Sequence, residues 1–288
     1  MNVNKHFTKL ISEIGEENNL KITEISSLSG GDINNVFLVD TEASGKRVIK
    51  INLAEKYPGM FEAEKEGLQA LAAPKVIDVP EAIATGQVDE ESYLLLEYKA
   101  PGRETQDFWE KFGAQMAALH KNTSDTFGFG IDNYIGSLPQ YNTKCSSASE
   151  FYITQRLEPQ FKMARDSKYE LGNIRAFLNK VPKLIPEEPP ALIHGDLWNG
   201  NYLVNIDGLP CLIDPATAYA PREMDLAMMK LFGGFNDRLF NIYNEKFPLE
   251  EGFEDRIKLW QLYYLLVHLN LFGSGYLNSV TGIIKRYL

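Results

Sequence analysis

Three polar residues with chemically useful side chains lie between residues 192 and 216. Asp196 and Asn201 are five residues apart in the segment His194-Gly-Asp-Leu-Trp-Asn-Gly-Asn201, and Asp214 ends the apolar run that follows. In this order, one carboxylate can accept a proton from a hydroxyl group, while an amide oxygen and the second carboxylate hold a magnesium ion. The pattern therefore suggests phosphoryl transfer from a nucleotide to an alcohol. Because Asp and Asn are also common in ordinary turns, this interpretation requires a nucleotide site elsewhere in the chain.

Residues that could form a nucleotide site occur in the N-terminal third. Gly30 and Gly31 stand between two predicted strands, where the lack of side chains lets backbone amides approach phosphates. A plain hairpin turn is the alternative for such a glycine pair. Lys50 lies near the end of a β-branched strand, and Glu64 falls on the apolar face of a predicted helix, three residues after Phe61. An unpaired carboxylate on that face would be costly, so we expect an ion pair between Lys50 and Glu64.

A third candidate segment is the apolar strand predicted over residues 93–98, which ends in Glu97, Tyr98 and Lys99 before a Pro-Gly turn. Such an end suits a hinge between two lobes, in which backbone groups would hydrogen-bond an adenine ring. An ordinary strand end is the alternative. Together these three segments predict a site for a nucleotide bound with magnesium.

The remaining pattern predicts the elements that position these residues. Strands are expected at 22–28, 36–39, 47–51 and 93–98, and helices at 7–17, 60–71, 108–120, 151–164, 169–181, 221–232, 237–247 and 253–272. A long loop over 127–147, rich in glycine and aromatic residues, is of a length that is often functional. Asp225, near the start of one predicted helix, could cap that helix or brace the catalytic loop. We expect an α+β chain with a small β-rich nucleotide-binding lobe (1–98) and a larger, mainly helical catalytic and substrate-binding lobe (99–288).

Composition narrows the function classes. The net charge of −10 argues against nucleic acid as a partner, because binding the phosphate backbone needs a basic surface. No apolar stretch is long enough to span a membrane, and the N-terminus lacks a signal-peptide pattern. The two cysteines, Cys145 and Cys211, are too few for a disulfide framework. We therefore expect a cytoplasmic protein with no membrane partner.

Several motifs together resemble one known family. They are His194-Gly-Asp-Leu-Trp-Asn-Gly-Asn201, Leu212-Ile-Asp-Pro-Ala216, Arg222-Glu-Met-Asp-Leu-Ala-Met-Met229, Asp132-Asn-Tyr-Ile-Gly-Ser137, Phe61-Glu-Ala-Glu64 and His268-Leu-Asn-Leu-Phe-Gly273. Over nearly its whole length the chain resembles the fructosamine kinase (ketosamine 3-kinase) family, within the protein-kinase-like and aminoglycoside-phosphotransferase fold. The tryptophan after Asp-Leu and the C-terminal match distinguish it from general aminoglycoside and choline kinases.

The resemblance implies a role for each site residue. Asp196 would be the catalytic base, Asn201 and Asp214 the magnesium ligands, and Lys50 with Glu64 the pair that anchors the phosphates of ATP. The implied reaction transfers the γ-phosphate to the 3-hydroxyl of a ketosamine, a glycated amine, and so contributes to deglycation. Candidates to line the substrate pocket are Trp198, Asn133, Tyr134, Tyr219, His268 and Asn270. Packing inside the protein is the alternative, above all for His268.

Two departures from the family pattern and two other functions are open at this stage. Asp32 stands where relatives carry a small neutral residue, and a carboxylate there would repel phosphates. Residues 143–149 lack a tryptophan that relatives often have, which could alter the substrate entrance. The other functions are an aminoglycoside- or choline-type phosphotransferase and a nucleotide-binding pseudokinase that acts as an interaction module. The chain retains five polar residues that a binding module would not need together, which argues against the pseudokinase. They are Lys50, Glu64, Asp196, Asn201 and Asp214.

Overall fold

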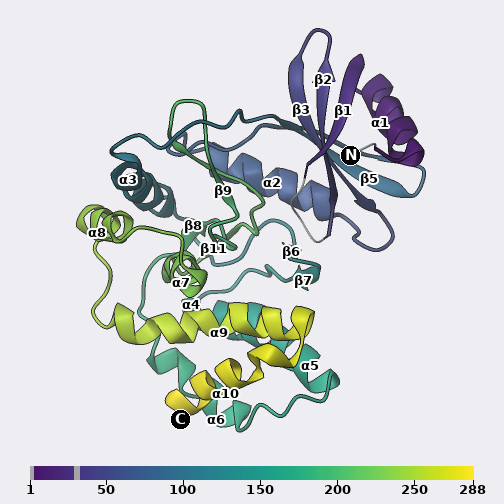
Figure 1. The fold of residues 1–288 in the computed structure, drawn as a ribbon. Coiled ribbons are helices and arrows are strands. Elements are labelled where there is room, and N and C mark those ends of the chain that lie inside the picture. Colours follow the sequence, from purple (N-terminus) through teal and green to yellow (C-terminus); the bar gives the residue numbers. More distant parts are fainter. Residues whose placement is uncertain (1–2, 29–32) are drawn as a thin grey trace.

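The N-terminal lobe is an antiparallel sheet with one helix on each face (Figure 1). The computed structural model describes residues 3–28 and 33–288. The strands are β1 (Ile22–Leu28), β2 (Asn35–Thr41), β3 (Gly45–Leu53), β4 (Ala82–Val88) and β5 (Glu91–Glu97), in the order β1-β2-β3-β5-β4. The helices are α1 (Lys5–Glu17) and α2 (Met60–Ala72). Gly30, Gly31 and Asp32 lie outside the described residues.

Strand alternation decides which residues of β3 face the catalytic lobe. Ile49 and Ile51 are fully buried in a core shared with α1, which contributes residues such as Ile11. Because successive side chains of a strand point to opposite faces, Lys50 is directed to the other side, toward α2. On that side Phe61 of α2 packs in a second core. The same two-residue period that builds the α1 core therefore places the lysine beside α2.

The C-terminal lobe is mainly helical. Its helices are α3 (Phe108–His120), α4 (Ala148–Phe151), η1 (Tyr152–Leu157), α5 (Glu158–Asp166), α6 (Ile174–Leu178), η2 (Val181–Lys183), α7 (Glu223–Phe232), α8 (Asp237–Lys246), α9 (Phe253–Phe272), η3 (Ser274–Tyr276) and α10 (Leu277–Arg286). The long helix α9 contacts α7, α5 and α10, and its Trp260 and Leu266 are fully buried. A helix that is apolar on most of its circumference belongs in the middle of a domain, and α9 is the centre of this lobe (Figure 1).

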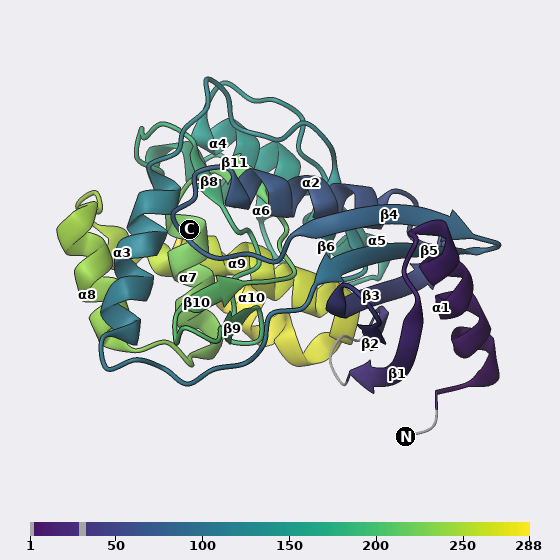
Figure 2. The same ribbon diagram turned by 90° about the horizontal axis from the view of Figure 1, so that it is seen from above.

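Short two-stranded sheets stand between the lobes and adjoin the polar motifs (Figure 2). Hairpins are formed by β6 (Asn133–Ile135) with β7 (Leu138–Gln140) and by β9 (Tyr202–Val204) with β10 (Pro210–Leu212). A further sheet pairs β8 (Ala191–Ile193) with β11 (Ala218–Ala220), which are separated in sequence by the β9–β10 hairpin. One hydrophobic core extends across the lobes, because Phe61 and Leu94 of the N-terminal lobe share it with Phe112 and Leu212 of the C-terminal lobe. In the part of the chain that the structure describes, no helix is long and apolar enough to cross a membrane.

The two-lobed α+β fold expected from the sequence is confirmed, as are most predicted elements. The helix expected over 169–181 is wrong: only Ile174–Leu178 is α-helical, because Gly172 adopts a left-handed backbone conformation (φ 80°) inside that range and Asn173 then caps the start of the helix. The helix expected over 151–164 exists, but η1 within it is a π-helix. The division at residue 98 stays a prediction.

Candidate active site

The candidate catalytic loop, residues 194–201, follows β8 and is held by unusual backbone geometry. Gly195 has φ 85°, and a Cβ atom there would lie 2.0 Å from the carbonyl oxygen of Ala216, so only glycine fits. Asp214, which follows β10, also has a left-handed backbone (φ 55°). Strained residues of this kind are held in place by their surroundings and cluster at functional sites.

Asp225 of α7 holds the loop that contains Asp196 in place through hydrogen bonds to its backbone. Its carboxylate accepts hydrogen bonds from the backbone N–H groups of His194 (2.7 Å) and Gly195 (2.8 Å) and contacts Nε2 of His120 (3.2 Å). Burial raises the pKa of Asp225, but these partners outweigh it and lower the pKa overall. Of the two roles considered for Asp225, the brace is confirmed.

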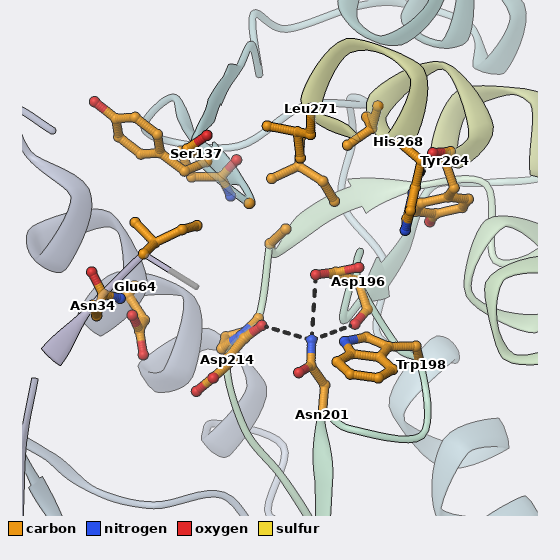
Figure 3. A pocket seen from close by; sticks show the side chains of 18 of the residues that line it. Asn34, Glu64, Ser137, Asp196, Trp198, Asn201, Asp214, Tyr264, His268 and Leu271 are labelled. Carbon is orange, nitrogen blue, oxygen red and sulfur yellow. Dashed lines mark hydrogen bonds between the residues drawn. The ribbon is translucent and has the colours of Figure 1, made fainter. Parts of the chain in front are cut away.

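Asp196, Asn201 and Asp214 lie side by side on one wall (Figure 3). The Asn201 amide nitrogen donates to the backbone carbonyl of Asp196 (2.8 Å) and, at longer distances, to its carboxylate (3.3 Å) and to the carbonyl of Asp214 (3.5 Å). With the nitrogen committed to these acceptors, the amide oxygen remains for a cation. The spacing that first suggested a site is therefore matched by proximity in space.

Lys50 connects the two lobes at this wall. Its ammonium group lies 2.5 Å from Glu64 and 2.6 Å from Asp214, so the expected Lys50–Glu64 ion pair is confirmed. Burial lowers the pKa of Lys50, but the charges of Asp214 and Glu64 raise it overall, which keeps the lysine charged. Burial raises the pKa of Glu64, and the Asp214 charge adds to this.

The side chain of Asp196 is a candidate general base. Burial, together with the charges of Asp214 and Asp225, raises the pKa of Asp196 to about 7. A base is most effective when its pKa is near the working pH. A carboxylate whose pKa is raised to neutrality and that faces a cavity is a candidate for proton transfer.

The main cavity has a volume of about 680 Å³ and gathers most of the predicted site residues. Its walls include Lys50, Glu64, Asp196, Asn201, Asp214, Trp198, Asn133, Tyr134 and His268. The proposed hinge residues are not part of these walls. Lys99 instead forms ion pairs with Asp78 and Glu97, both at 2.9 Å. The contribution of Glu97, Tyr98 and Lys99 to adenine binding therefore stays a prediction.

The substrate candidates differ in their placement. Tyr219 and Asn270 are not on the cavity wall: the Tyr219 ring faces Phe129, and the Asn270 amide donates to Gln160. His268 reaches the wall, but its Nδ1 is bonded to the Tyr264 carbonyl (2.7 Å). Burial lowers the pKa of His268, which favours the neutral ring.

Residues of the long loop form the opposite side of the cavity. Tyr134 donates from its hydroxyl to the carbonyl of Pro58 (3.0 Å), which ties the β6–β7 hairpin to the N-terminal lobe. Asn133 is buried, and both atoms of its amide are hydrogen-bonded, to the Thr217 carbonyl and to Gln140. Asn133 therefore has less capacity to bind a substrate directly than the sequence suggested.

Aromatic residues at the cavity that were not identified from the sequence include Tyr57, Tyr264, Phe232 and Phe272. Phe232 and Phe272 end α7 and α9, each just before a glycine, and both remain exposed on the wall. His268 lies between them, with ring centroids at 4.9 Å from Phe232 and 5.4 Å from Phe272. The sequence signal that could have revealed Phe232 and Phe272 is a large aromatic residue directly before the glycine that ends a predicted helix.

Trp198 stands beside Asp196 (Figure 3), and its position depends on Gly200. The indole is 41% exposed, and a Cβ atom at Gly200 would lie 2.4 Å from its ring.

Gly200→Ala should therefore displace the indole and raise the KM for the phosphate acceptor about tenfold, with the KM for ATP nearly unchanged. Gly282→Ala is the matched control, because a Cβ there meets nothing within 4 Å. Equal acceptor KM values for both variants in steady-state assays would exclude a role for the indole position.

The residues at the wall fit magnesium better than a transition metal. Among residues 3–28 and 33–288, no group of three or more His, Cys, Asp or Glu side chains could hold a metal ion. Magnesium needs only one or two carboxylates when nucleotide phosphates supply further oxygens, and it prefers oxygen ligands. The Asp214 carboxylate and the Asn201 amide could supply two oxygen ligands of this kind.

The chain is similar to proteins of one family over nearly its full length. A family model for fructosamine kinase matches residues 4–288. A "Probable ketoamine kinase" of Synechocystis sp. is 40% identical over 272 residues, which cover 93% of this chain and 91% of the relative. A chloroplastic protein-ribulosamine 3-kinase of Arabidopsis thaliana is 38% identical over 278 residues, covering 93% and 83%.

A solved structure supports the same relationship. A crystal structure from Haemophilus somnus, whose assignment as a fructosamine-3-kinase is provisional, superposes with a TM-score of 0.87 at 28% identity, covering 96% of both chains. Its similarity extends over both lobes, so the resemblance seen in the sequence motifs is confirmed for the whole fold. The chain belongs to the fructosamine kinase family.

Proposed function

We propose that this protein transfers the γ-phosphate of ATP to the 3-hydroxyl of a ketosamine, a glycated amine. Family membership supports a phosphotransferase that uses ATP and acts on a hydroxyl group. The observation that carries the proposal is the meeting of Lys50, Glu64, Asp196, Asn201 and Asp214 at one cavity. Phosphoryl transfer depends mainly on positioning and charge neutralisation, and these residues supply both.

Each residue has one task in this proposal. ATP with magnesium supplies the phosphoryl group and neutralises its developing charge. Asn201 and Asp214 would hold the metal through their oxygens, and Lys50, kept in place by Glu64, would place its positive charge against the phosphates. Asp196 accepts the proton of the attacking hydroxyl, for which its raised pKa of about 7 is suited. Gly30 and Gly31 would cover the phosphates, and Glu97 to Lys99 would contact the adenine.

The acceptor side of the cavity is lined by uncharged groups, which suits a sugar and an aliphatic amine chain. Trp198, Tyr134 and His268 are on this side, together with the exposed Phe232 and Phe272. Aromatic faces bind sugars and protonated amines through stacking and cation–π contacts. Free or protein-bound adducts of ribulose or fructose are both compatible with these walls, and deglycation in the cytoplasm is the role we propose.

Three acceptors separate the competing functions. ADP release and phosphorus NMR should be followed with ATP, magnesium and either ribulosyl-lysine, fructosyl-lysine or kanamycin. We expect a phosphate ester on the sugar of at least one ketosamine and none on kanamycin. Phosphorylation of kanamycin alone would support an aminoglycoside-type enzyme. Clear ATP binding without turnover of any acceptor would support the interaction module.

A further inference from the structure

A chain of buried hydrogen bonds runs behind the cavity wall and has no place in the function described so far. The hydroxyl of Tyr263 in α9 donates to Oε1 of Gln140 (2.6 Å), and Nε2 of Gln140 donates to Oδ1 of Asn133 (2.7 Å). The Asn133 amide then donates to the carbonyl of Thr217 (2.9 Å). All four residues are at most 5% exposed. Water therefore cannot readily replace a lost partner in this chain.

The backbone carbonyl groups that accept from Gln140 and Asn133 fix the donor-to-acceptor direction of this hydrogen-bond chain. Gln140 Nε2 also donates to the carbonyl of Ala216 (3.2 Å), and a carbonyl can only accept. The Gln140 nitrogen must therefore face Ala216, which leaves its oxygen for Tyr263. In the same way, the Thr217 carbonyl fixes the Asn133 nitrogen and directs the Asn133 oxygen to Gln140. Every amide has one satisfied orientation, as expected of a network that specifies a single arrangement.

Gln140 is the branching point between two functional segments. Gln140 ends β7, and its bond to Asn133 at the start of β6 joins the two ends of the β6–β7 hairpin. The residues between them, Tyr134 to Ser137, line the acceptor side of the cavity. Through Ala216, Gln140 holds the segment that follows Asp214, and the N–H of Ala216 donates to the carbonyl of His194 in the catalytic loop (2.9 Å). One amide thus contacts both the acceptor wall and the segment that carries the candidate metal ligand.

We propose that Gln140 is a positioning residue that couples the acceptor wall to the metal-binding segment. A shift of Asp214 on binding a metal–nucleotide complex is transmitted through Ala216 and Gln140 to Asn133, and so fixes the hairpin that meets the acceptor. Gln140 itself touches neither ligand through its amide, since both amide atoms are bonded within the protein. The acceptor part of this proposal rests on the proposed function, whereas the coupling of the two segments does not.

Hydrogen exchange measures the coupling without any acceptor. Amide exchange over residues 133–140 should be compared with and without magnesium and a non-hydrolysable ATP analogue. We expect added protection in the natural protein and none in Gln140→Leu, which keeps much of the side-chain volume but no amide. Tyr263→Phe removes only the far partner of Gln140 and should keep most of the protection. If Gln140→Leu does not fold, Asn133→Ala, which interrupts the same chain one step later, takes its place with the same expectation.

Gln160→Leu is the matched control, because Gln160 is an equally buried glutamine whose side-chain oxygen accepts from Asn270, which is not on the cavity wall. It should lose thermal stability but retain the protection. In kinetics, Gln140→Leu should raise the KM for the ketosamine about tenfold, about 1.4 kcal/mol, with a smaller change in kcat. Equal protection in Gln140→Leu and the natural protein would overturn the coupling. Absence of ketosamine turnover in the natural protein would instead remove the proposed function and leave the exchange result valid.

Discussion

Asp196→Asn is expected to lower kcat for ketosamine phosphorylation about 10³-fold, while the Kd for the magnesium–ATP complex changes by less than about threefold. The amide keeps the shape of the carboxylate but cannot accept the proton of the hydroxyl. ATP binding should persist because Lys50, Asn201 and Asp214, the proposed ligands of the nucleotide and metal, are unchanged. Single-turnover assays and calorimetric titration with a non-hydrolysable ATP analogue measure the two quantities separately.

The outcome distinguishes the base from a residue that only shapes the site. A matched control is Asp207→Asn, at the exposed turn between β9 and β10, which changes the same functional group away from the cavity wall. Its kcat should stay within about twofold of the natural value. Near-normal turnover by Asp196→Asn would show that another group accepts the proton.

The same substitution should stabilise the nucleotide-free protein at neutral and alkaline pH. The pKa of Asp196 is raised from an ordinary 3.8 to about 7, so between these values the folded state binds a proton that the unfolded state has lost. The contribution of Asp196 to the stability of the natural protein therefore falls as the pH rises from about 4 to about 7. Asp196→Asn removes this loss, and its gain should reach about 1–3 kcal/mol above pH 7 and vanish below pH 4. Unfolding in urea at pH 4 and pH 8 tests this, and equal differences at both values would contradict it.

Lys50→Met should have the second largest effect, on activity and stability together. It removes the proposed positive charge against the phosphates, which is expected to lower kcat/KM at least 10²-fold. It also leaves Glu64, a buried carboxylate whose side chain is 11% exposed, without its partner. Breaking a buried ion pair from one side costs about 3 kcal/mol. The loss should be smaller at pH 5 than at pH 8, because a raised pKa lets Glu64 become neutral at the lower pH.

A double variant separates the two effects of Lys50→Met. Adding Glu64→Met removes the buried one of the two carboxylates that Lys50 contacts, and apolar replacement of a buried pair is often nearly neutral. Most of the stability should return, because the Asp214 side chain is 48% exposed and remains solvated. Activity should not return, because the charge is still missing. Recovery of turnover in the double variant would mean that Lys50 serves only to neutralise Glu64.

Local rules explain why much of the site could be predicted from the sequence. Side chains return to the same face of a strand every two residues and of a helix every three to four residues. The face on which Lys50 or Glu64 lies can therefore be predicted from a few residues around it. The spacing of Asp196 and Asn201 lies within one loop and was equally accessible. The order and type of most elements followed from the same patterns.

What the sequence did not disclose depends on contacts between distant segments. The bonding of Asn133 to Thr217 joins residues 84 positions apart, and no local pattern encodes it. Tyr219 was assigned to the substrate pocket by family resemblance, yet in β11 its ring packs near Phe129. The helix expected over 169–181 failed for a local reason: Gly172 has a left-handed backbone, and α6 begins only after Asn173, its N-cap.

The hydrophobic core that extends across the lobes bears on how this chain folds. Phe61 and Leu94 share that core with Phe112 and Leu212, so neither lobe can complete its own interior without the other. In energetic terms, the two lobes are therefore not two independently stable units. We therefore expect the chain to lose its structure in one cooperative transition, with the catalytic cleft assembled only when both halves are present.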